Sequence, residues 1–336
     1  MTIKQKLIEK VKNLLKEKGQ KALEIAKQSV LQEKSGYEPI NEALRYFMEE
    51  IWLDVPHPAL LSLACEAVGE NPDTTASIGA AITVLAGAAD IHDDIIDQSL
   101  IKDGKETVFG KFGKDVALLV GDALLFKGLM MLHEACEKLR MNQREEILRL
   151  LTQAFFKISG AEAKETGFKR KFDLSAEEYL EIIEDKAAVA EATAKIGAII
   201  GGGTRDEIEA LGYYGKTLSV LMTIRDEFID IFELNEIKNR AENECLPLPI
   251  LFTFKDSRKR DKIVSLLKEG KLTEKKKNKI LDIVMTAVET RELKGKMLSL
   301  IKEADQQLKH VKKCKGTLRF ILKSILEGLD TSRADF

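Results

Sequence analysis

Hydrophobic residues recur at helical spacing along most of the chain, with lysine and glutamate between them. The spacing is clear near the start, where the apolar residues are Leu7, Ile8, Val11, Leu14 and Leu15. It predicts an N-terminal amphipathic helix that either packs on the rest of the protein or lies on a membrane surface. From Phe252 onward the same spacing predicts further amphipathic helices with lysine-rich exposed faces. With only six prolines in 336 residues, these patterns predict an all-α protein.

Proline, glycine and capping residues mark the expected helix ends. A helix over residues 40–53 should stop before Pro56 and Pro58, because proline lacks the amide donor that a helix needs. A buried helix over residues 59–68 should close at Gly69. The chain has no linker rich in proline, glycine or serine, so we expect one domain over residues 1–336.

Further signals outline the middle of the chain. Asp73 or Thr74 is the expected cap of a long helix. Residues 98–114, which contain three glycines, are predicted to form a loop. A capping box over residues 175–178 should begin a helix that runs to the glycines at 201–203.

Composition narrows the class of protein. A net charge of −2 and the lack of a basic patch with interleaved aromatics argue against nucleic-acid binding. No run of 18 apolar residues is present, so we expect no transmembrane segment, although peripheral membrane contact stays open. The cysteines are widely spaced and form no CxxC pair, which predicts reduced thiols and a cytoplasmic location. They are Cys65, Cys136, Cys245 and Cys314.

Four aspartates end an otherwise apolar segment: Asp90, Asp93, Asp94 and Asp97. In a helix, Asp93 and Asp97 share a face with Cβ atoms about 5–6 Å apart, and like charges at that spacing repel each other. A hard divalent cation removes this cost, and Mg²⁺ typically binds one or two carboxylates and keeps its other positions for water and phosphate. The alternative is a solvated acidic face. The apolar residues before the cluster favour metal binding.

A second acidic cluster repeats the pattern far along the chain, with Asp226, Glu227 and Asp230. One such spacing is weak evidence in a chain with 32% charged residues. Two clusters, each at the end of an apolar helix, are stronger. Facing each other across a bundle, they are expected to hold several Mg²⁺ ions and a diphosphate.

These motifs resemble those of the (E)-isoprenyl diphosphate synthases, the polyprenyl synthetase family. The first DDxxD motif stands as DDIID at residues 93–97, after Ile91 and His92. The run ALLVGDALL at residues 117–125, the helix that bears Lys186 and the LPLPI stretch at residues 246–250 also match. The resemblance covers most of residues 58–250.

The resemblance implies a single large helical bundle with a central substrate cavity, three Mg²⁺ ions and an allylic prenyl diphosphate substrate. It implies metal ligands at Asp93, Asp94, Asp97, Asp226, Glu227 and Asp230. It also implies that Lys102 and Lys186 contact the diphosphate, and that catalysis depends on Asp93, Asp97, Asp226, Asp230 and Lys186. Small residues before the first motif, Ala88 and Ala89, imply either room for a long prenyl chain or close helix packing. A homodimer is expected.

The chain departs from the family where the second substrate would bind. The family's Gly-Lys-x-x-Arg segment, which holds isopentenyl diphosphate, reads Leu-Asp-Val-Pro-His at residues 53–57. The paired arginines after the first motif become Lys102 and Asp103. Asp90 replaces an apolar residue and is a candidate catalytic base, an anion that steers a carbocation, or a partner in a structural ion pair.

Because these departures remove cations, we expect an enzyme that ionises an allylic diphosphate with an acceptor or outcome other than condensation with isopentenyl diphosphate. Three alternatives stay open. The first is an ordinary trans-polyprenyl diphosphate synthase in which lysines of residues 98–114 replace the lost cations. The second is a terpene synthase. The third is a non-catalytic regulatory subunit that associates with an active synthase.

Overall fold

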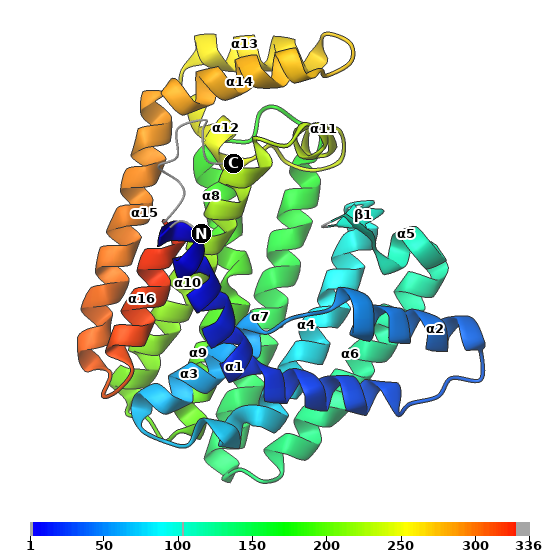
Figure 1. The fold of residues 1–336 in the computed structure, drawn as a ribbon, viewed down its shortest axis with the longest axis vertical. Helices are drawn as coiled ribbons and strands as arrows, with labels where there is room; N and C mark the ends of the chain where they lie inside the picture. Colours follow the sequence, from blue (N-terminus) through cyan, green and yellow to red (C-terminus); the bar gives the residue numbers. More distant parts are fainter. Residues whose placement is uncertain (1–2, 103, 327–336) are drawn as a thin grey trace. The chain divides into compact units, whose positions relative to one another are not determined.

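The computed structural model describes residues 3–102 and 104–326, and the regular structure in this part of the chain is almost entirely helical (Figure 1). The all-α prediction is therefore confirmed. The N-terminal helices are α1 (Ile3–Leu31), α2 (Glu38–Tyr46), the π-helix η1 (Phe47–Ile51), α3 (Pro56–Val68), the 3-10 helix η2 (Pro72–Thr75), α4 (Ala76–Ile96), α5 (Val108–Phe112), α6 (Lys114–Cys136) and α7 (Met141–Phe168). The later helices are α8 (Ala176–Lys186), α9 (Ala188–Ile200), α10 (Arg205–Asp230), α11 (Leu234–Asn243), α12 (Leu248–Thr253), α13 (Ser257–Lys268), α14 (Glu274–Thr286), α15 (Val288–Gln307), the 3-10 helix η3 (Leu308–His310) and α16 (Lys315–Ile325).

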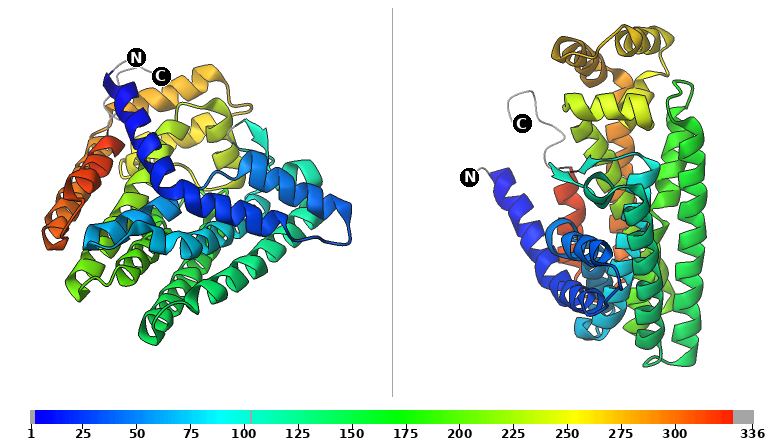
Figure 2. Two further views of the ribbon diagram at one scale, coloured as in Figure 1. Left: turned by 60° about the horizontal axis from the view of Figure 1, so that its bottom comes forward. Right: turned by 90° about the vertical axis from the view of Figure 1, so that its right-hand side faces the viewer.

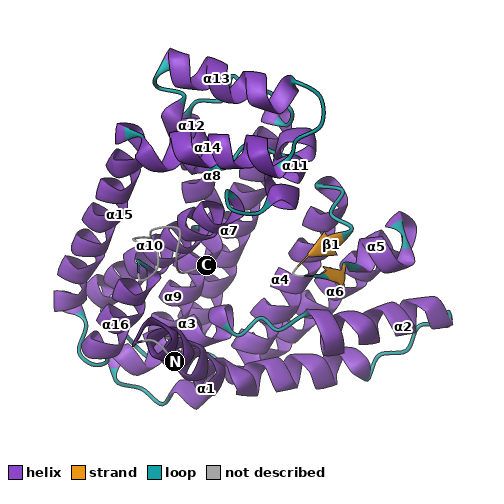
Figure 3. Ribbon diagram, turned by 45° about the horizontal axis from the view of Figure 1, so that its top comes forward, coloured by secondary structure: helices purple, strands orange, loops and turns teal. Residues whose placement is uncertain are grey.

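A small hairpin lies in the segment predicted to be a loop. Strands β1 (Ile101–Lys102) and β2 (Lys105–Glu106) pair antiparallel, with Lys102 opposite Lys105 (orange in Figure 3). Gly104 has a φ of 74°, a left-handed conformation that glycine adopts without strain. The Thr107 side chain then accepts a hydrogen bond from the Gly110 amide and caps α5. The segment is thus more ordered than a plain loop.

The chain forms two compact units. Unit 1 comprises residues 1–152, 192–212 and 310–315, and unit 2 comprises residues 153–191, 213–309 and 316–336. The first acidic motif belongs to unit 1 and the second to unit 2. One domain over the whole chain, with a central substrate cavity, stays a prediction.

Helix α4 is the core of unit 1. Helix α6 runs alongside α4, and α1 and α3 also pack against α4 (Figures 1 and 2). Glycine permits the close approach of α6: a Cβ atom built on Gly121 would lie 2.5 Å from Nε2 of His92, and one on Gly128 would lie 2.8 Å from the side chain of Leu85. These contacts fix the helix that ends in the first acidic motif.

In unit 2, α12 is buried along its whole length, and α8, α14 and α15 pack around it. This placement explains the LPLPI stretch, since Pro247 precedes the helix and the apolar residues after it fill the core. Burial of such side chains contributes about 1.5–3 kcal/mol each. Helix α10 carries the second acidic motif at its C-terminal end.

Several predicted helix ends are confirmed. Gly69 closes α3 with a φ of 107°, and Ser175 forms a capping box with Glu178 at the start of α8. The helix predicted from the capping box to the glycines at 201–203 is interrupted, because α8 ends at Lys186 and α9 begins at Ala188.

Two other predicted ends are wrong. Pro56 begins α3 instead of lying before it, because proline fits the first turn of a helix, where an amide donor is not needed. Neither Asp73 nor Thr74 caps α4. The side chain of Asn71 instead caps the short η2 that leads into α4.

All four cysteines are free thiols, as predicted, and three of them are buried. Pro72–Ile96 and Lys114–Cys136 are long and apolar enough to cross a membrane by length and composition alone, which is weak evidence, so the expectation of no transmembrane segment stays a prediction. The first is 61% buried, as expected for the core helix of a folded protein. The second contains α6, which is less buried and exposes large apolar side chains.

Candidate active site

The first acidic motif lies at the C-terminal end of α4. Asp97 caps this helix, and its amide donates a hydrogen bond of 2.8 Å to the carbonyl oxygen of Asp93. Both side chains are half-buried, one turn apart on the same helix, as the spacing predicts.

Asp94 lies deeper than its neighbours, with 5% of its surface exposed. Burial raises the pKa of Asp94 to about 7, and the charges of Asp90 and Asp97 add to this effect, while Lys102 opposes it. A carboxylate is therefore costly here. A cation close to the cluster would offset that cost.

The lysines of the hairpin region make contacts with the protein. The ammonium of Lys102 lies 2.5 Å from Oδ1 of Asp90 and 3.8 Å from Oδ1 of Asp94. Burial lowers the pKa of Lys102, but these acids outweigh burial and the pKa is raised.

The other two lysines lie against η1 and α2. Lys105 donates a hydrogen bond of 2.6 Å to the carbonyl oxygen of Glu50, and the ammonium of Lys111 lies 3.6 Å from the ring centre of Tyr46. The sequence did not predict these partners, and contact of the lysines with a diphosphate stays a prediction.

His92 helps to orient the first motif. Its Nε2 atom lies 3.3 Å from Oδ1 of Asp122 on α6, in the space that Gly121 leaves open. The segments that contain His92 and Asp122 match the family in sequence, but the sequence did not predict their contact. The packing of a histidine over a glycine could not be read from helical spacing, which assigns a face and no partner.

The second motif ends α10. The side chain of Asp226 is 60% exposed and lies 3.4 Å from Nη1 of Arg225. Asp230 is more enclosed: burial raises its pKa to about 6, Arg240 opposes this shift and Glu227 adds to it. Asp226 and Asp230 are one turn apart, like Asp93 and Asp97.

Glu227 belongs to a buried hydrogen-bond network. Its Oε1 accepts hydrogen bonds from the hydroxyl of Tyr179 at 2.6 Å and from Nη2 of Arg240 at 2.5 Å. Its Oε2 accepts a third, at 2.8 Å, from the amide of Leu248. The carboxylate thus ties α10 to α8, α11 and α12. The expectation that Glu227 binds metal stays a prediction, and because both of its carboxylate oxygens already accept hydrogen bonds, the metal ligands proposed below omit it.

Lys186 also lies among acids. Its ammonium is 2.7 Å from Oε1 of Glu162 and contacts Glu165, whose carboxylate accepts a hydrogen bond of 3.3 Å from Tyr179. The Lys186 side chain is 32% exposed. Lys186 therefore forms ion pairs with two acids of α7.

The segment over residues 53–57 places an acid beside a histidine. Asp54 is buried, and its Oδ1 lies 3.0 Å from Nδ1 of His57 and accepts a hydrogen bond of 3.3 Å from the His57 amide. Burial lowers the pKa of His57, but Asp54 outweighs this effect and the pKa is raised. Asp103, the other departure near this region, lies outside the described residues.

The acids suit a magnesium ion that binds together with its substrate. Within residues 3–102 and 104–326, no group of three or more His, Cys, Asp or Glu side chains forms a ready metal site. Mg²⁺, however, is usually held by one or two carboxylates and completed by substrate phosphates and water. The pairs Asp93 with Asp97 and Asp226 with Asp230 supply hard oxygen ligands in that number.

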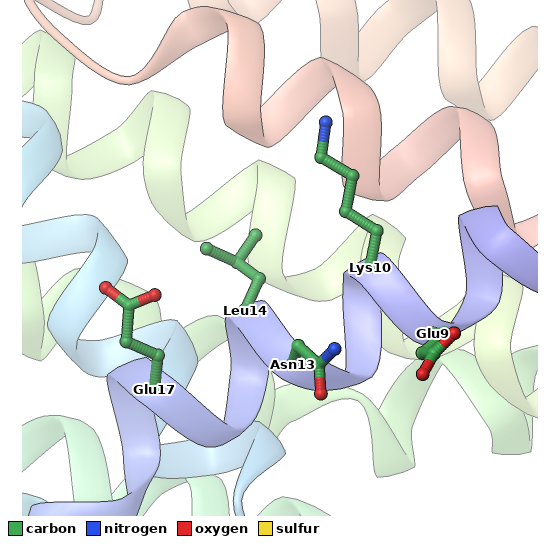
Figure 4. A pocket seen from close by; sticks show the side chains of 5 residues that line it. All are labelled: Glu9, Lys10, Asn13, Leu14 and Glu17. Atoms are coloured by element: carbon green, nitrogen blue, oxygen red, sulfur yellow. The ribbon is translucent and has the colours of Figure 1, made fainter.

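A surface pocket lies along α1 and is lined by Glu9, Lys10, Asn13, Leu14 and Glu17. Figure 4 shows that these side chains come from one helix and point in different directions. Polar groups that converge on a ligand are the mark of a binding site. We therefore base the candidate site on the acidic motifs and not on this pocket.

The network around Glu227 gives a test of stability. Replacing Arg240 by Met should lower the free energy of unfolding by about 3–5 kcal/mol, because it leaves the buried carboxylate of Glu227 and the partly buried carboxylate of Glu244 without their guanidinium. Denaturant titration measures this loss. The double variant Arg240→Met, Glu227→Gln should lose less than the sum of the single variants.

The exposed pair of Arg149 and Glu146 provides the matched control. Arg149→Met should change the stability by about 1 kcal/mol or less, since exposed ion pairs contribute little. Equal losses for the two arginine variants would contradict a structural role for the buried network.

The chain is similar in sequence to proteins of known family. The family model described as polyprenyl synthetase matches residues 57–284. A short chain isoprenyl diphosphate synthase of Methanothermobacter thermautotrophicus is 32% identical over 221 residues, which are 63% of this chain and 67% of the relative. A geranylgeranyl diphosphate synthase of Sulfolobus acidocaldarius is 28% identical over 65% of this chain and 64% of its own. The chain thus spans about two thirds of the length of these relatives.

The fold agrees with this result. A geranylgeranyl pyrophosphate synthetase of Pyrococcus horikoshii has a TM-score of 0.83 at 22% identity, with 96% of this chain and all of the other covered. A geranylgeranyl pyrophosphate synthetase of Geoglobus acetivorans has a TM-score of 0.81 at 19% identity, with 93% and 99% covered. At this identity the likeness shows the fold alone. Taken with the family match and the two acidic motifs, it establishes that the chain belongs to the polyprenyl synthetase family, a family of prenyltransferases.

Proposed function

We propose that this protein is a Mg²⁺-dependent prenyltransferase that ionises an allylic prenyl diphosphate and delivers the prenyl cation to an acceptor other than isopentenyl diphosphate. Enzymes of the family use Mg²⁺. The relatives named above are synthases of isoprenyl and geranylgeranyl diphosphates. Retention of both acidic motifs supports the first half of the proposal, and the segment at residues 53–57 supports the second.

In this proposal Asp93 and Asp97 hold Mg²⁺ in unit 1, and Asp226 and Asp230 hold it in unit 2, with three ions as the family expectation. When bound, the metal supplies electrostatic stabilisation of the departing diphosphate. Lys102 and Lys186 add ammonium donors, each already held by neighbouring acids. A dry prenyl pocket would protect the carbocation from water.

The observation that carries the changed acceptor is the pairing of Asp54 with His57. These residues stand where the family has a lysine and an arginine for the second diphosphate. A charge-assisted contact is worth about 1.5–3 kcal/mol, so the loss of two or more should weaken binding by orders of magnitude. Lys105 and Lys111 do not replace them in this structure, because each is engaged with η1 or α2.

Ordinary chain elongation is the second candidate, and the 32% identity to a short chain isoprenyl diphosphate synthase favours it. Prenyl chain length stays a prediction under both candidates. Ala88 is buried, and Gly87 packs against the stacked rings of Phe47 and Trp52, which suits close helix packing. Ala89, in contrast, is exposed beside the first motif.

The metal assignment is tested by Asp93→Ala and Asp230→Ala. A bound metal is worth several kcal/mol, so each variant should lose about a hundredfold or more of its Mg²⁺-dependent diphosphate release while it stays folded. Phosphate-release assays and thermal unfolding measure the two effects. Asp115→Ala, an exposed acid on α6, is the control and should retain activity. Full activity of both motif variants at buffered Mg²⁺ would rule the assignment out.

The acceptor is tested by incubating the protein and Mg²⁺ with allylic diphosphates of increasing length, with and without isopentenyl diphosphate. Mass spectrometry should find that the allylic substrate is consumed without elongation, and calorimetry should find far weaker binding of isopentenyl diphosphate. An elongated diphosphate would establish ordinary synthesis. A hydrocarbon or alcohol would indicate intramolecular capture, and no consumption would support a regulatory subunit.

We also propose that the protein forms a homodimer in the cytoplasm through α6. This helix exposes five large apolar side chains: Leu118, Leu119, Phe126, Leu129 and Met130. Several large exposed apolar side chains on one helix are typical of an interface. A second copy is favoured over a lipid surface because the four cysteines are free thiols, which is typical of a protein in a reducing compartment such as the cytoplasm.

Sedimentation analysis tests the dimer. Phe126, which is 68% exposed, should be central to the contact, so Phe126→Glu should shift the protein towards monomer without unfolding it. Phe156→Glu, an exposed aromatic of unit 2, is a matched variant for comparison. A wild-type protein that sediments as a monomer at micromolar concentration would contradict the proposal.

A further inference from the structure

Asp90 is one of the two acids of the first cluster, with Asp94, that the proposed metal ligands do not include. It lies one helical turn before Asp93 and Asp94 on α4, with 20% of its side chain exposed. The ammonium of Lys102 contacts Asp90 at 2.5 Å and is also 3.8 Å from Asp94. This contact occupies Oδ1, one of the two carboxylate oxygens of Asp90.

The hairpin that carries Lys102 is held by contacts of its own. Tyr46 donates a hydrogen bond of 2.7 Å to the carbonyl oxygen of Glu106, and Thr107 donates one of 2.7 Å to that of Ser99. Lys105 contacts the carbonyl oxygen of Glu50. The backbone at Lys102 is thus fixed without Asp90. The Lys102 side chain is not, because a lysine has a flexible four-carbon stem.

Metal binding makes this flexibility important. A divalent ion at Asp93 and Asp97 would add positive charge beside Lys102 and repel its ammonium. Asp90, a turn away from those ligands, keeps an opposite charge in contact with the lysine. An ammonium has three donors, so a hydrogen bond to Asp90 leaves others to reach a phosphate oxygen.

We propose that Asp90 is a positioning residue that holds the Lys102 ammonium beside the first acidic motif while metal is bound, so that Lys102 donates to the diphosphate of the substrate. This inference rests on the proposed function, since it assigns Lys102 to the same diphosphate. In this role Asp90 acts through Lys102 and is not itself a catalytic base.

The test is a double-mutant cycle with Asp90→Asn, Lys102→Gln and the double variant. Calorimetric titration with inorganic diphosphate at saturating Mg²⁺ should show about tenfold weaker binding for each single variant, the size of one charge-assisted contact. The double variant should bind no more weakly than either single variant, because both remove the same contact. In steady-state kinetics KM for the allylic diphosphate should rise and kcat should change little.

Two variants separate positioning from a loss of structure. Lys102→Arg should keep diphosphate affinity within a few-fold of the wild type. Lys105→Gln, on the same hairpin but bonded to Glu50, should bind diphosphate as the wild type does. Thermal unfolding checks that every variant is folded. If Asp90→Asn does not fold, Asp90→Ser takes its place in the cycle.

Each outcome decides between the inference and its alternatives. Unchanged or tighter diphosphate binding by Asp90→Asn, with weaker binding by Lys102→Gln, would overturn the positioning role. Additive losses in the double variant, or an equal loss in Lys105→Gln, would do the same. If wild-type protein binds no diphosphate with Mg²⁺, the proposed function fails and the inference fails with it. If the wild type binds and Asp90→Asn matches it, the inference alone fails.

Discussion

Repulsion between carboxylates within one helical turn is the constraint around which both acidic motifs are built. Asp93 with Asp97, and Asp226 with Asp230, each place two acids on one helical face, an arrangement that destabilises a bare helix. Burial raises the pKa of Asp94 to about 7 and that of Asp230 to about 6, and the charges of neighbouring acids add to both increases. Positive charge close to each helix end offsets this cost.

The two motifs offset the repulsion in different ways. In unit 1 the counter-charge is Lys102, a flexible side chain that is 49% exposed and reaches the acids from a hairpin. In unit 2 it is Arg240, 12% exposed and fixed by Glu227 and Glu244. A buried guanidinium with several partners is a permanent part of the structure, because breaking the pair leaves an uncompensated charge. An exposed ammonium can change partners when substrate and metal bind.

The chain retains the architecture of its structural neighbours at about one fifth sequence identity. The pair of Asp54 and His57 stands where the resemblance to the family implies two cations. Asp54 accepts a hydrogen bond from the His57 amide at the start of α3. The fold alone does not identify the acceptor, which depends on the residues of the site.

The sequence by itself determined the all-α class, the helix ends at Gly69 and Ser175, and the spacing of Asp93 with Asp97. These features depend on interactions within a few residues, which helical periodicity, capping and glycine conformation record directly. Tertiary structure alone decided the partners of the charged residues.

Glu227 shows why those partners could not be predicted. Its spacing is that of a metal ligand, yet its carboxylate bonds to Tyr179 and Leu248, 48 and 21 residues away in the chain. Lys102 similarly meets Asp90 only because the hairpin folds over α4. Periodicity assigns a side chain to a helix face, whereas the packing of other helices against that face determines which charge it meets.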